Sequence, residues 1–444
     1  MAMKKKPVTG MKDILPREME IRDYAIGLIK ETYKNFGFTS VETPAVEHIE
    51  NLSSNQGGEN EKLIFKVLKR GDKLTSAARK LVESAGRNQG QEETSDADEE
   101  SRYDVGLLTD SGLRYDLTLP LSRYYSNNAN DLPSPFKALQ MGNVWRADRP
   151  QRGRFRQFMQ CDIDILGEQS ILAEIELILA TTTLLGKLDF EKFTIRINDR
   201  RILKAMAAYS GFAEADYDTV FIILDKMDKI GIDGVSEELE KEGFSRDSID
   251  KYLNLFRSVE GKNDVSGLRI IADKLGDFLE AEVRESLEEI ITSVDATKTA
   301  KFEMVFDPTL VRGMSYYTGT IFEVSMPQYG GSCGGGGRYD KMVGKFLGQD
   351  TPACGFSIGF ERIIMIMMDE GFKIPSEGKK KAFLIEKGIK GERLAEIISQ
   401  AQKDRLEGNQ VLVVRMNKNK KFQKQQLLEQ GYEDVKEFYL NPLN

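Results

Sequence analysis

The sequence has one histidine and three cysteines in 444 residues, and this scarcity excludes several kinds of chemistry. A histidine-rich metal site is excluded, and a Ser-His-Asp triad would need His48, which has no nucleophile nearby in the sequence. We therefore expect His48 to be structural and acid–base chemistry to fall to carboxylates, tyrosines or the substrate. Cys161, Cys333 and Cys354 match no zinc or disulfide spacing and fit a reducing cytoplasm.

Long apolar runs are also missing. No segment approaches the roughly 20 apolar residues that span a bilayer, and the basic start MAMKKKPVTGMKDILP lacks the apolar core of a signal peptide. A hydrophobic content of 40% and a charged content of 30% are typical of a soluble globular protein. We therefore expect a cytoplasmic protein with no membrane partner, and the length predicts two or three domains.

The charges are unevenly distributed along the chain. Residues 375–444 hold 14 Lys and Arg against 10 Asp and Glu, a net charge of +4, whereas the rest carries −12. A basic tail on an acidic body suggests a module that binds a polyanion.

Hydrophobic periodicity predicts an α+β protein in four parts. Residues 1–202 mix helices with strands, 203–296 form a helical insertion, and strands return in 297–374. Residues 375–444 alternate strand and helix, as in a small α/β domain. Within the first part, residues of about 71–103 form an insertion whose acidic, apolar-poor centre predicts disorder.

An arginine-rich segment interrupts two stretches of period-two alternation. FKALQMGNVWRAD and RGRFRQFMQCDIDILG predict an antiparallel hairpin with a long basic tip. Arg146 lies on the first strand, and the tip holds Arg149, Arg152, Arg154 and Arg156 without any lysine. Because arginine binds phosphate through two parallel hydrogen bonds, we expect a phosphate ligand here; a merely soluble basic loop is the alternative.

Two further segments predict a ligand site. GGSCGGGGRYD fails the test for a dinucleotide loop, because its surroundings indicate antiparallel strands rather than a βαβ unit. We expect a glycine-rich turn at 330–337 where the backbone approaches a flat ligand flanked by Tyr339; a flexible turn is the alternative. VRGMSYYTG offers Arg312 beside Tyr316 and Tyr317, although two tyrosines that alternate across a strand would leave at least one in the core.

Carboxylates also recur at alternate positions. LRYDLT places Asp116 and Thr118 on one face of an expected strand, and QCDIDI does the same with Gln160, Asp162 and Asp164. Buried carboxylates are costly unless a cation or a donor pairs with them, so an ammonium or imidazole group would suit them. Arginines for phosphates and carboxylates for a cation fit a nucleoside triphosphate that meets an amino acid.

The chain resembles a known family. GMKDILP, RYDLTLPLSRY, RADRPQRGRFRQF, QCDIDI, LVRGMSYYTG, GGGGRYD and GFSIGFERI occur in the order found in the histidyl-tRNA synthetases, which are class II aminoacyl-tRNA synthetases. The resemblance covers nearly the whole chain apart from 71–103 and part of the helical insertion. It implies a six-stranded antiparallel catalytic sheet flanked by helices, a homodimer, and ATP, Mg²⁺, histidine and the histidine tRNA as cofactors or partners.

The resemblance also assigns the phosphate-binding residues. Arg146 matches the motif 2 arginine that holds the ATP α-phosphate, and Arg362 matches the motif 3 arginine beside the adenine and the γ-phosphate. Arg312 matches the arginine that contacts both the α-phosphate and the histidine carboxylate, so Arg146 and Arg312 are the catalytic candidates. The other residues assigned to ATP are Arg154, Phe158 and Glu361.

The remaining assignments concern histidine, tRNA and the dimer. The residues assigned to histidine are Asp116, Thr118 and Gln160 for its amino group and Asp164, Tyr317 and Tyr339 for its side chain. The residues assigned to the tRNA acceptor end are Arg149, Gln151, Arg152 and Arg156. The segment around Pro44 resembles the dimer-forming motif 1, and no residue is assigned to a metal ion.

The implied reaction has two steps. The histidine carboxylate attacks the α-phosphorus of ATP and pyrophosphate leaves, after which a ribose hydroxyl of the tRNA 3′ end attacks the adenylate. Residues 1–202 and 297–374 would then form the catalytic domain, and 375–444 an anticodon-binding-like domain that is shortened by its last strand and helix. Ser315 stands where the family usually has aspartate.

One alternative function stays open. A synthetase-like regulatory subunit of ATP phosphoribosyltransferase would bind histidine without charging tRNA. Such proteins usually lack the tail domain and lose the motif arginines, whereas this chain retains Arg146, Arg312, Arg362 and a tail. The sequence therefore favours the ligase.

Overall fold

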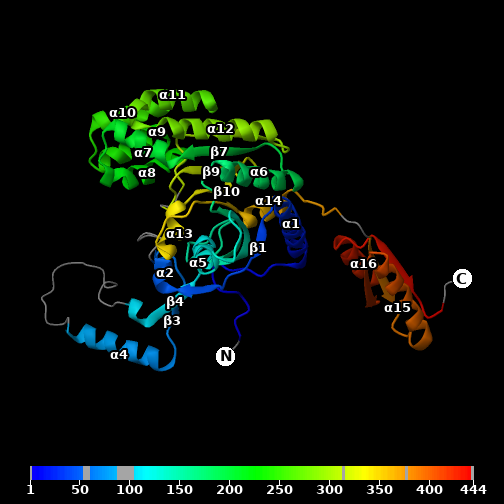
Figure 1. Ribbon diagram of the computed structural model, residues 1–444. Helices are drawn as coiled ribbons and strands as arrows, with labels where there is room; N and C mark the ends of the chain where they lie inside the picture. Colours follow the sequence, from blue (N-terminus) through cyan, green and yellow to red (C-terminus); the bar gives the residue numbers. More distant parts are fainter. Residues whose placement is uncertain (1–2, 54–60, 88–104, 313–315, 376–378, 442–444) are drawn as a thin grey trace. The chain divides into compact units, whose positions relative to one another are not determined.

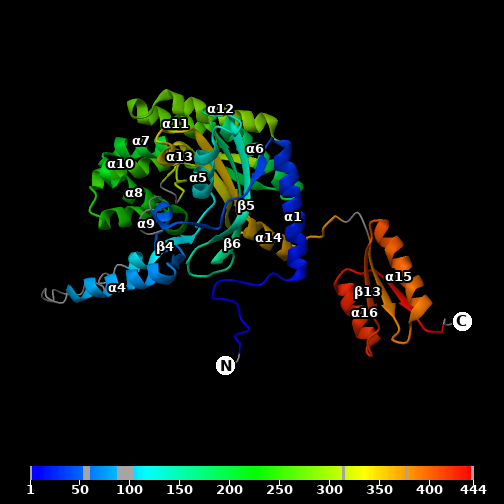
Figure 2. The same cartoon turned by 60° about the horizontal axis from the view of Figure 1, so that its bottom comes forward.

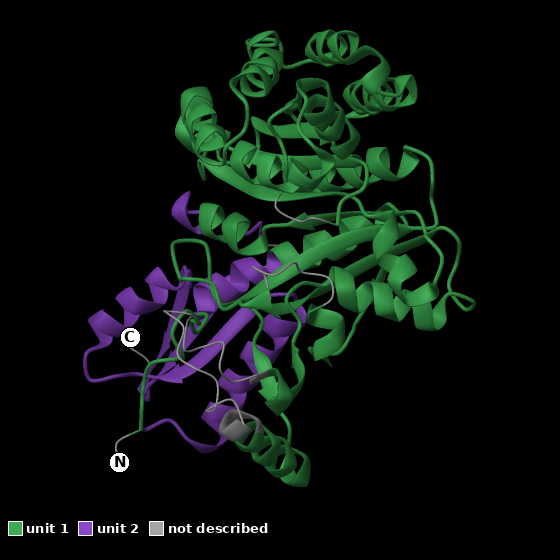
Figure 3. Cartoon of the chain, turned by 90° about the vertical axis from the view of Figure 1, so that its left-hand side faces the viewer, with its two compact units in different colours: residues 1–14, 25–367 green, residues 15–24, 368–444 purple. Residues whose placement is uncertain are grey.

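The computed structural model forms two compact units (Figures 1 and 3). The residues that it describes are 3–53, 61–87, 105–312, 316–375 and 379–441. The first unit comprises residues 1–14 and 25–367, and the second comprises 15–24 and 368–444. Helix α1 (Pro16–Asn35) contributes to both.

A large mixed sheet forms the centre of the first unit. From edge to edge its strands are β1 (Thr39–Val41), β5 (Phe136–Trp145), β6 (Gln157–Leu166), β11 (Ala353–Ile358), β10 (Gly331–Arg338), β9 (Thr320–Met326), β7 (Phe193–Asp199) and β8 (Phe302–Phe306). The neighbours from β5 to β7 are all antiparallel, whereas β1 and β8 pair in parallel at the edges. The six-stranded antiparallel sheet that the resemblance implies is thus confirmed, with one parallel strand added at each edge.

The predicted arginine-tipped hairpin is confirmed. Strands β5 and β6 pair without a break from Phe136 opposite Leu166 to Trp145 opposite Gln157. The period-two pattern sets this register, because a slip of one residue would turn every apolar side chain to the wrong face. The tip, residues 146–156, therefore projects from two rigid strands.

The glycine-rich segment is a strand, and the prediction of a turn at 330–337 was wrong. Gly331–Arg338 form β10, which lies between β9 and β11. A Cβ at Gly336 would lie 1.9 Å from the carbonyl oxygen of Gly355. Glycine is required because the neighbouring backbone comes this close, which composition alone does not show.

Asp116 and Thr118 do not share a strand face, so that prediction was also wrong. Strand β4 (Thr109–Leu113) ends before Asp116, and helix α5 (Thr118–Asn128) begins at Thr118. β4 belongs to a separate small sheet, between β2 (Val46–His48) and β3 (Lys66–Leu68). Pro44 lies between β1 and β2, where the chain changes from the large sheet to the small one.

Part of the segment predicted to be disordered is a helix. Residues Gly71–Arg87 form α4, whereas the acidic residues 88–103 lie outside the described residues. Leu74, Ala77, Ala78, Leu81 and Val82 follow the i, i+3, i+4 spacing of an amphipathic helix. Composition was a poorer guide here than periodicity.

Helices lie around the large sheet (Figures 1 and 2). The helical insertion connects β7 to β8 and consists of α7 (Arg200–Ser210), α8 (Tyr217–Leu224), α9 (Met227–Lys241), α10 (Arg246–Arg257), α11 (Val265–Leu275) and α12 (Ala281–Thr297). The other helices of this unit include α2 (Ile49–Ser53), α6 (Leu172–Lys187), α13 (Asp340–Leu347) and α14 (Phe360–Asp369). In Figure 1 the insertion helices gather beside β7, and α6 packs against α12.

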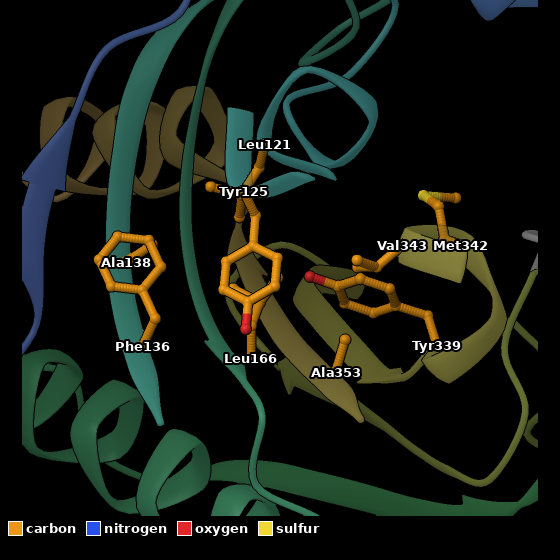
Figure 4. Packing of buried hydrophobic residues seen from close by; sticks show 9 residues of the cluster. All are labelled: Leu121, Tyr125, Phe136, Ala138, Leu166, Tyr339, Met342, Val343 and Ala353. Atoms are coloured by element: carbon orange, nitrogen blue, oxygen red, sulfur yellow. The ribbon is translucent and has the colours of Figure 1, made fainter. Parts of the chain in front are cut away.

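A buried cluster supports the sheet next to the ligand cavity described below (Figure 4). Leu121 and Tyr125 of α5 pack there with Phe136 of β5 and Leu166 of β6. Tyr339 belongs to the same cluster and is 2% exposed. Its ring is therefore fixed by apolar packing, and its hydroxyl is held in place to donate to Asp164.

The second unit is a small α/β fold. Its strand β12 (Lys380–Ile385) lies between β13 (Gln410–Arg415) and β14 (Asp434–Phe438), and both neighbours are parallel to it. Helices α15 (Gly391–Leu406) and α16 (Lys420–Glu429) complete the strand–helix order that the sequence predicts. Along the described parts of the chain, no helix has the length and apolar character needed to cross a membrane.

Candidate active site

A cavity of about 490 Å³ lies over the middle of the large sheet, within the size range of small-molecule sites. Strands β6, β9, β10 and β11 contribute to its lining, together with the starts of α5 and α14. The residues assigned to ATP or histidine that line it are Asp116, Thr118, Arg146, Arg154, Phe158, Gln160, Asp164, Arg312, Tyr317, Tyr339, Glu361 and Arg362. These side chains were assigned from separate motifs, and the fold brings them to one place.

Other predicted residues do not line this cavity. Arg149, Gln151 and Arg152 are exposed on the hairpin tip, where a contact with tRNA stays a prediction. Arg156 is partly buried: its Nε donates to the carbonyl oxygen of Asp148 at 3.0 Å, and its backbone nitrogen donates to that of Gly10 at 2.8 Å. Arg156 therefore ties the tip to GMKDILP.

Arg146 is held rigidly at the end of β5. Its Nε donates to the carbonyl oxygen of Tyr115 at 3.1 Å. The guanidinium carbon lies 4.3 Å from the centre of the Tyr115 ring and 5.2 Å from that of Phe158. Because cation–π contacts with two rings restrict its orientation, the guanidinium of Arg146 is held in place before any ligand binds.

Arg312 approaches the cavity from a strained backbone position. Its φ is +61°, and its Nη1 donates to Glu323 Oε2 at 2.9 Å. Its Nε is buried and has no hydrogen-bond partner among the residues described here. A Cβ at Gly335 would lie 2.6 Å from Nη1, so the glycine strand makes room for this guanidinium. An anion at this point would satisfy the buried donor.

Arg362 completes a set of arginines at the cavity. It lies at the start of α14, where its Nη1 donates to the carbonyl oxygen of Ser332 at 2.5 Å and its guanidinium lies 5.3 Å from the Tyr329 ring. Arg146, Arg312 and Arg362 come from elements far apart in the sequence yet line one cavity. That arrangement suits an extended polyanion better than a single carboxylate.

The same cavity contains buried carboxylates. Asp116 is 3% exposed, and Asp162 and Asp164 are 4% exposed. Tyr339 donates from its hydroxyl to Asp164 Oδ1 at 2.6 Å, and burial raises the pKa of Asp164 to about 7 although this hydrogen bond opposes the shift. Burial, and then the nearby Asp164, also raise the pKa of Asp162 well above its usual value. A cationic ligand would relieve this accumulated negative charge.

Tyr316 and Tyr317 do not alternate across a strand, because both precede β9. Both line the cavity, and the Tyr316 ring lies 4.8 Å from that of Tyr317 and 6.1 Å from that of Tyr339. The predicted alternation was therefore wrong, but both rings are partly buried and pack against the cluster around Tyr339. Ser315 lies outside the described residues.

Comparison with known proteins decides the family. The family model described as "Histidyl-tRNA synthetase" matches residues 107–363, more than half of the chain. The chain belongs to the histidyl-tRNA synthetase family. A histidine–tRNA ligase of Leifsonia xyli subsp. xyli (strain CTCB07) is 44% identical over 365 residues, which are 81% of this chain and 79% of that protein. The histidine–tRNA ligase of Christiangramia forsetii is 34% identical over 420 residues, 91% and 88% of the two chains.

Solved structures agree with this family in fold. The crystal structure of histidyl-tRNA synthetase from Nostoc sp. PCC 7120 has a TM-score of 0.74 and 26% identity, and the match covers 98% of this chain and 91% of that one. An ATP phosphoribosyltransferase regulatory subunit/histidyl-tRNA synthetase from Bacillus halodurans C has the same TM-score at 19% identity, which shows the fold alone. The curated relatives therefore favour the synthetase over the regulatory alternative.

Several residues of the cavity were not assigned from the sequence. Tyr115 stacks on Arg146, Glu323 binds Arg312, and Asp225 reaches the lining from the end of α8. Asp162 was grouped by its strand face with the carboxylates suited to a cation, but the resemblance gave it no role. Ser357 bears no charge to mark it. Period-two alternation in the sequence could have identified Asp162 as a cavity residue. The others reach the cavity only because elements far apart in the sequence pack together.

Proposed function

We propose that the protein is a histidine–tRNA ligase, which activates histidine with ATP and transfers it to the 3′ end of the histidine tRNA. One observation carries this proposal: three arginines and three buried carboxylates line a single cavity. They are Arg146, Arg312, Arg362, Asp116, Asp162 and Asp164. The family supports it, since a histidine–tRNA ligase is 44% identical to this chain. The regulatory-subunit function explains the carboxylates but not the retained arginines.

In this proposal the arginines bind ATP. Arg146 holds the α-phosphate, and Arg362 lies beside the adenine and the γ-phosphate, with Arg154, Phe158 and Glu361 also contacting the nucleotide. The support for Arg146 is its rigid placement between two rings, because a donor that is already aimed loses little entropy when the phosphate binds.

Histidine would occupy the acidic part of the cavity. Asp116, Thr118 and Gln160 bind its ammonium group, and Asp164, Tyr317 and Tyr339 surround its imidazole. Gln160 Oε1 is buried, and no hydrogen-bond partner for it exists among the described residues. Asp164 is fixed by the Tyr339 hydroxyl and can accept an imidazole N–H. Direct hydrogen bonding of the imidazole gives selectivity without an editing step.

The chemistry needs no base from the protein. A histidine carboxylate oxygen forms a bond to the α-phosphorus while the bond from that phosphorus to the pyrophosphate oxygen breaks. Negative charge grows on the phosphoryl oxygens, where Arg146 and Arg312 stabilise it. The tRNA 3′ ribose hydroxyl then attacks the adenylate carbonyl, its proton passes to a phosphate oxygen of the adenylate, and AMP leaves with the electrons of the broken carbon–oxygen bond.

Magnesium would accompany ATP and neutralise phosphate charge. The described residues contain no cluster of three or more His, Cys, Asp or Glu side chains that could hold a metal ion. Nucleotide sites often hold Mg²⁺ through phosphates with only one or two carboxylates. Glu361, next to Arg362 in the lining, keeps its assignment to ATP, and no residue is assigned to the metal ion.

The proposal extends to assembly and location. The protein would act as a homodimer in the cytoplasm, with 1–202 and 297–374 as catalytic domain, 203–296 as helical insertion and 375–444 as shortened anticodon-binding domain. The dimer is supported by the exposed apolar side chains of Val46 and Leu68 on the small sheet. The reducing compartment is supported by the three cysteines, which are buried and free. Sedimentation equilibrium would give the mass of two chains.

Gly355→Ala tests the histidine pocket. A Cβ at Gly355 would lie 2.0 Å from Asp164 Oδ1 and 3.1 Å from Tyr339 Cε1. Because overpacking costs about 1–3 kcal/mol, we expect the affinity for histidine, measured by calorimetry, to fall about tenfold or more while ATP binding is retained. Unchanged histidine affinity would show that histidine binds elsewhere.

The function itself is tested by two assays on the purified protein. We expect histidine-dependent exchange of pyrophosphate into ATP, and charging of bulk tRNA with histidine. Exchange without charging would support activation but contradict the proposed transfer step. Histidine binding without exchange would overturn the proposal in favour of the regulatory alternative.

A further inference from the structure

Three polar side chains form a continuous chain across two strands of the cavity floor. The register of β6 with β11 places Asp162 directly opposite Ser357. Ser357 donates from Oγ to Asp162 Oδ1 at 2.5 Å, and Gln160 donates from Nε2 to Ser357 Oγ at 3.3 Å. All three residues line the cavity.

The direction of these bonds follows from counting protons. A serine hydroxyl carries one proton and two acceptor lone pairs. Since Ser357 gives its proton to Asp162, its oxygen can only accept from Gln160. This fixes Nε2 as the amide atom that faces Ser357, and the amide oxygen must therefore turn away from it.

The oxygen of Gln160 is left for a ligand. Gln160 Oε1 is buried, and the described part of the chain offers it no hydrogen-bond donor. A buried acceptor without a donor destabilises the empty protein, and a ligand that donates to it removes this cost. The opposite amide orientation would present N–H groups to the same place and would repel an ammonium.

The carboxyl group of Asp162 maintains the direction of the hydrogen bonds from Gln160 through Ser357. Burial and the nearby Asp164 raise the pKa of Asp162, whereas the hydrogen bond from Ser357 lowers it. The net shift is upward, so the direction of these bonds rests on the geometry, in which Asp162 Oδ1 accepts from Ser357 Oγ. If Ser357 is replaced, Asp162 loses this hydrogen bond. If Asp162 is replaced, the Ser357 hydroxyl can donate to the amide oxygen of Gln160 instead.

We propose that Ser357 and Asp162 are positioning residues, which orient the Gln160 amide so that its oxygen selects ligands with a protonated amino group. The inference rests on the proposed function in taking histidine as that ligand. It goes further in assigning the selection of the ammonium to a hydroxyl and a carboxylate that act through Gln160.

Three ligands separate this role from general support of the pocket. Histidine carries an ammonium and a carboxylate, histidinol keeps the ammonium alone, and 3-(imidazol-4-yl)propionate keeps the carboxylate alone. With Ser357→Ala, we expect calorimetric affinities for histidine and histidinol to fall about tenfold, the effect of one hydrogen bond to a charged group. The affinity for imidazolepropionate and the KM for ATP stay unchanged. Asp162→Ala should show the same pattern.

Two variants serve as controls. Ser357→Thr keeps a hydroxyl and should restore the wild-type preference for ammonium ligands. Ser210→Ala removes another buried hydroxyl, which donates to the carbonyl oxygen of Met206 at 2.8 Å in α7, and should change no affinity.

The outcomes distinguish the inference from the function. Equal weakening of all three ligands by Ser357→Ala, or no weakening at all, overturns the positioning role while the proposed function stands. Wild-type protein that binds neither histidine nor histidinol overturns the proposed function, and the inference with it. Selective loss of the two amino ligands supports both.

Discussion

Arg312→Ala is expected to lower the rate of histidine-dependent ATP–pyrophosphate exchange by about 10²- to 10³-fold, the usual cost of removing one preorganised donor to a developing negative charge. Arg312 has a buried Nε without a partner in the described chain, so a bound anion is what completes its hydrogen bonding. In the proposed reaction that anion is the α-phosphate together with the histidine carboxylate. Both the binding of histidine and the chemical step should therefore suffer.

The variant should still fold. Glu323 loses Arg312 as a partner but keeps Arg196, whose Nη1 lies 3.5 Å from Glu323 Oε1. Arg269→Ala is the matched control, because that exposed guanidinium in α11 pairs with Glu288 at 2.9 Å and does not line the cavity. Exchange by Arg312→Ala within twofold of the control, with far-ultraviolet circular dichroism unchanged, would contradict the role assigned to Arg312.

Asp164→Asn is expected to change ligand affinity and stability in opposite directions. A neutral amide is a weaker acceptor than a carboxylate, so histidine should bind about 10- to 100-fold less tightly. The unfolding free energy should rise at neutral and higher pH, because the variant no longer buries a group whose ionisation is unfavourable in the folded protein. Calorimetric titration and urea unfolding would measure the two effects.

The pH dependence of this gain has a definite sign. The folded protein holds the pKa of Asp164 at about 7, whereas an unfolded chain gives about 3.9. Between these values the folded state binds the extra proton, so the wild type loses stability relative to Asp164→Asn as the pH rises toward 7. The difference between pH 5 and pH 8 should be on the order of 3 kcal/mol.

An exposed carboxylate provides the control for that difference. Asp247 in α10 pairs with Lys251 at 2.7 Å and its side chain is 76% exposed. Asp247→Asn should give nearly the same unfolding free energy relative to wild type at both pH values. If Asp164→Asn behaves like Asp247→Asn, the carboxyl of Asp164 is not held neutral by burial.

The sequence by itself determined the features that depend on local pattern. Period-two alternation predicted β5 and β6, and the arginines between them then had to lie at a hairpin tip. The alternation of strand and helix in residues 379–441 was predicted for the same reason, since each element buries its own periodic face. The motifs that resemble the family gave the residues that line the cavity, although their roles there stay predictions.

Only the tertiary structure decided how distant segments pair. The glycines of β10 were predicted to form a turn. They are needed because the backbone of Gly355 on the adjacent strand comes close, and residues next to them in the sequence do not show this. Asp116 lies between the end of β4 and the start of α5, so spacing along the chain misplaced it. Ser357 meets Asp162 because two strands separated by almost 200 residues share one register. Pairing across such separations depends on the whole sheet, and no local pattern specifies it.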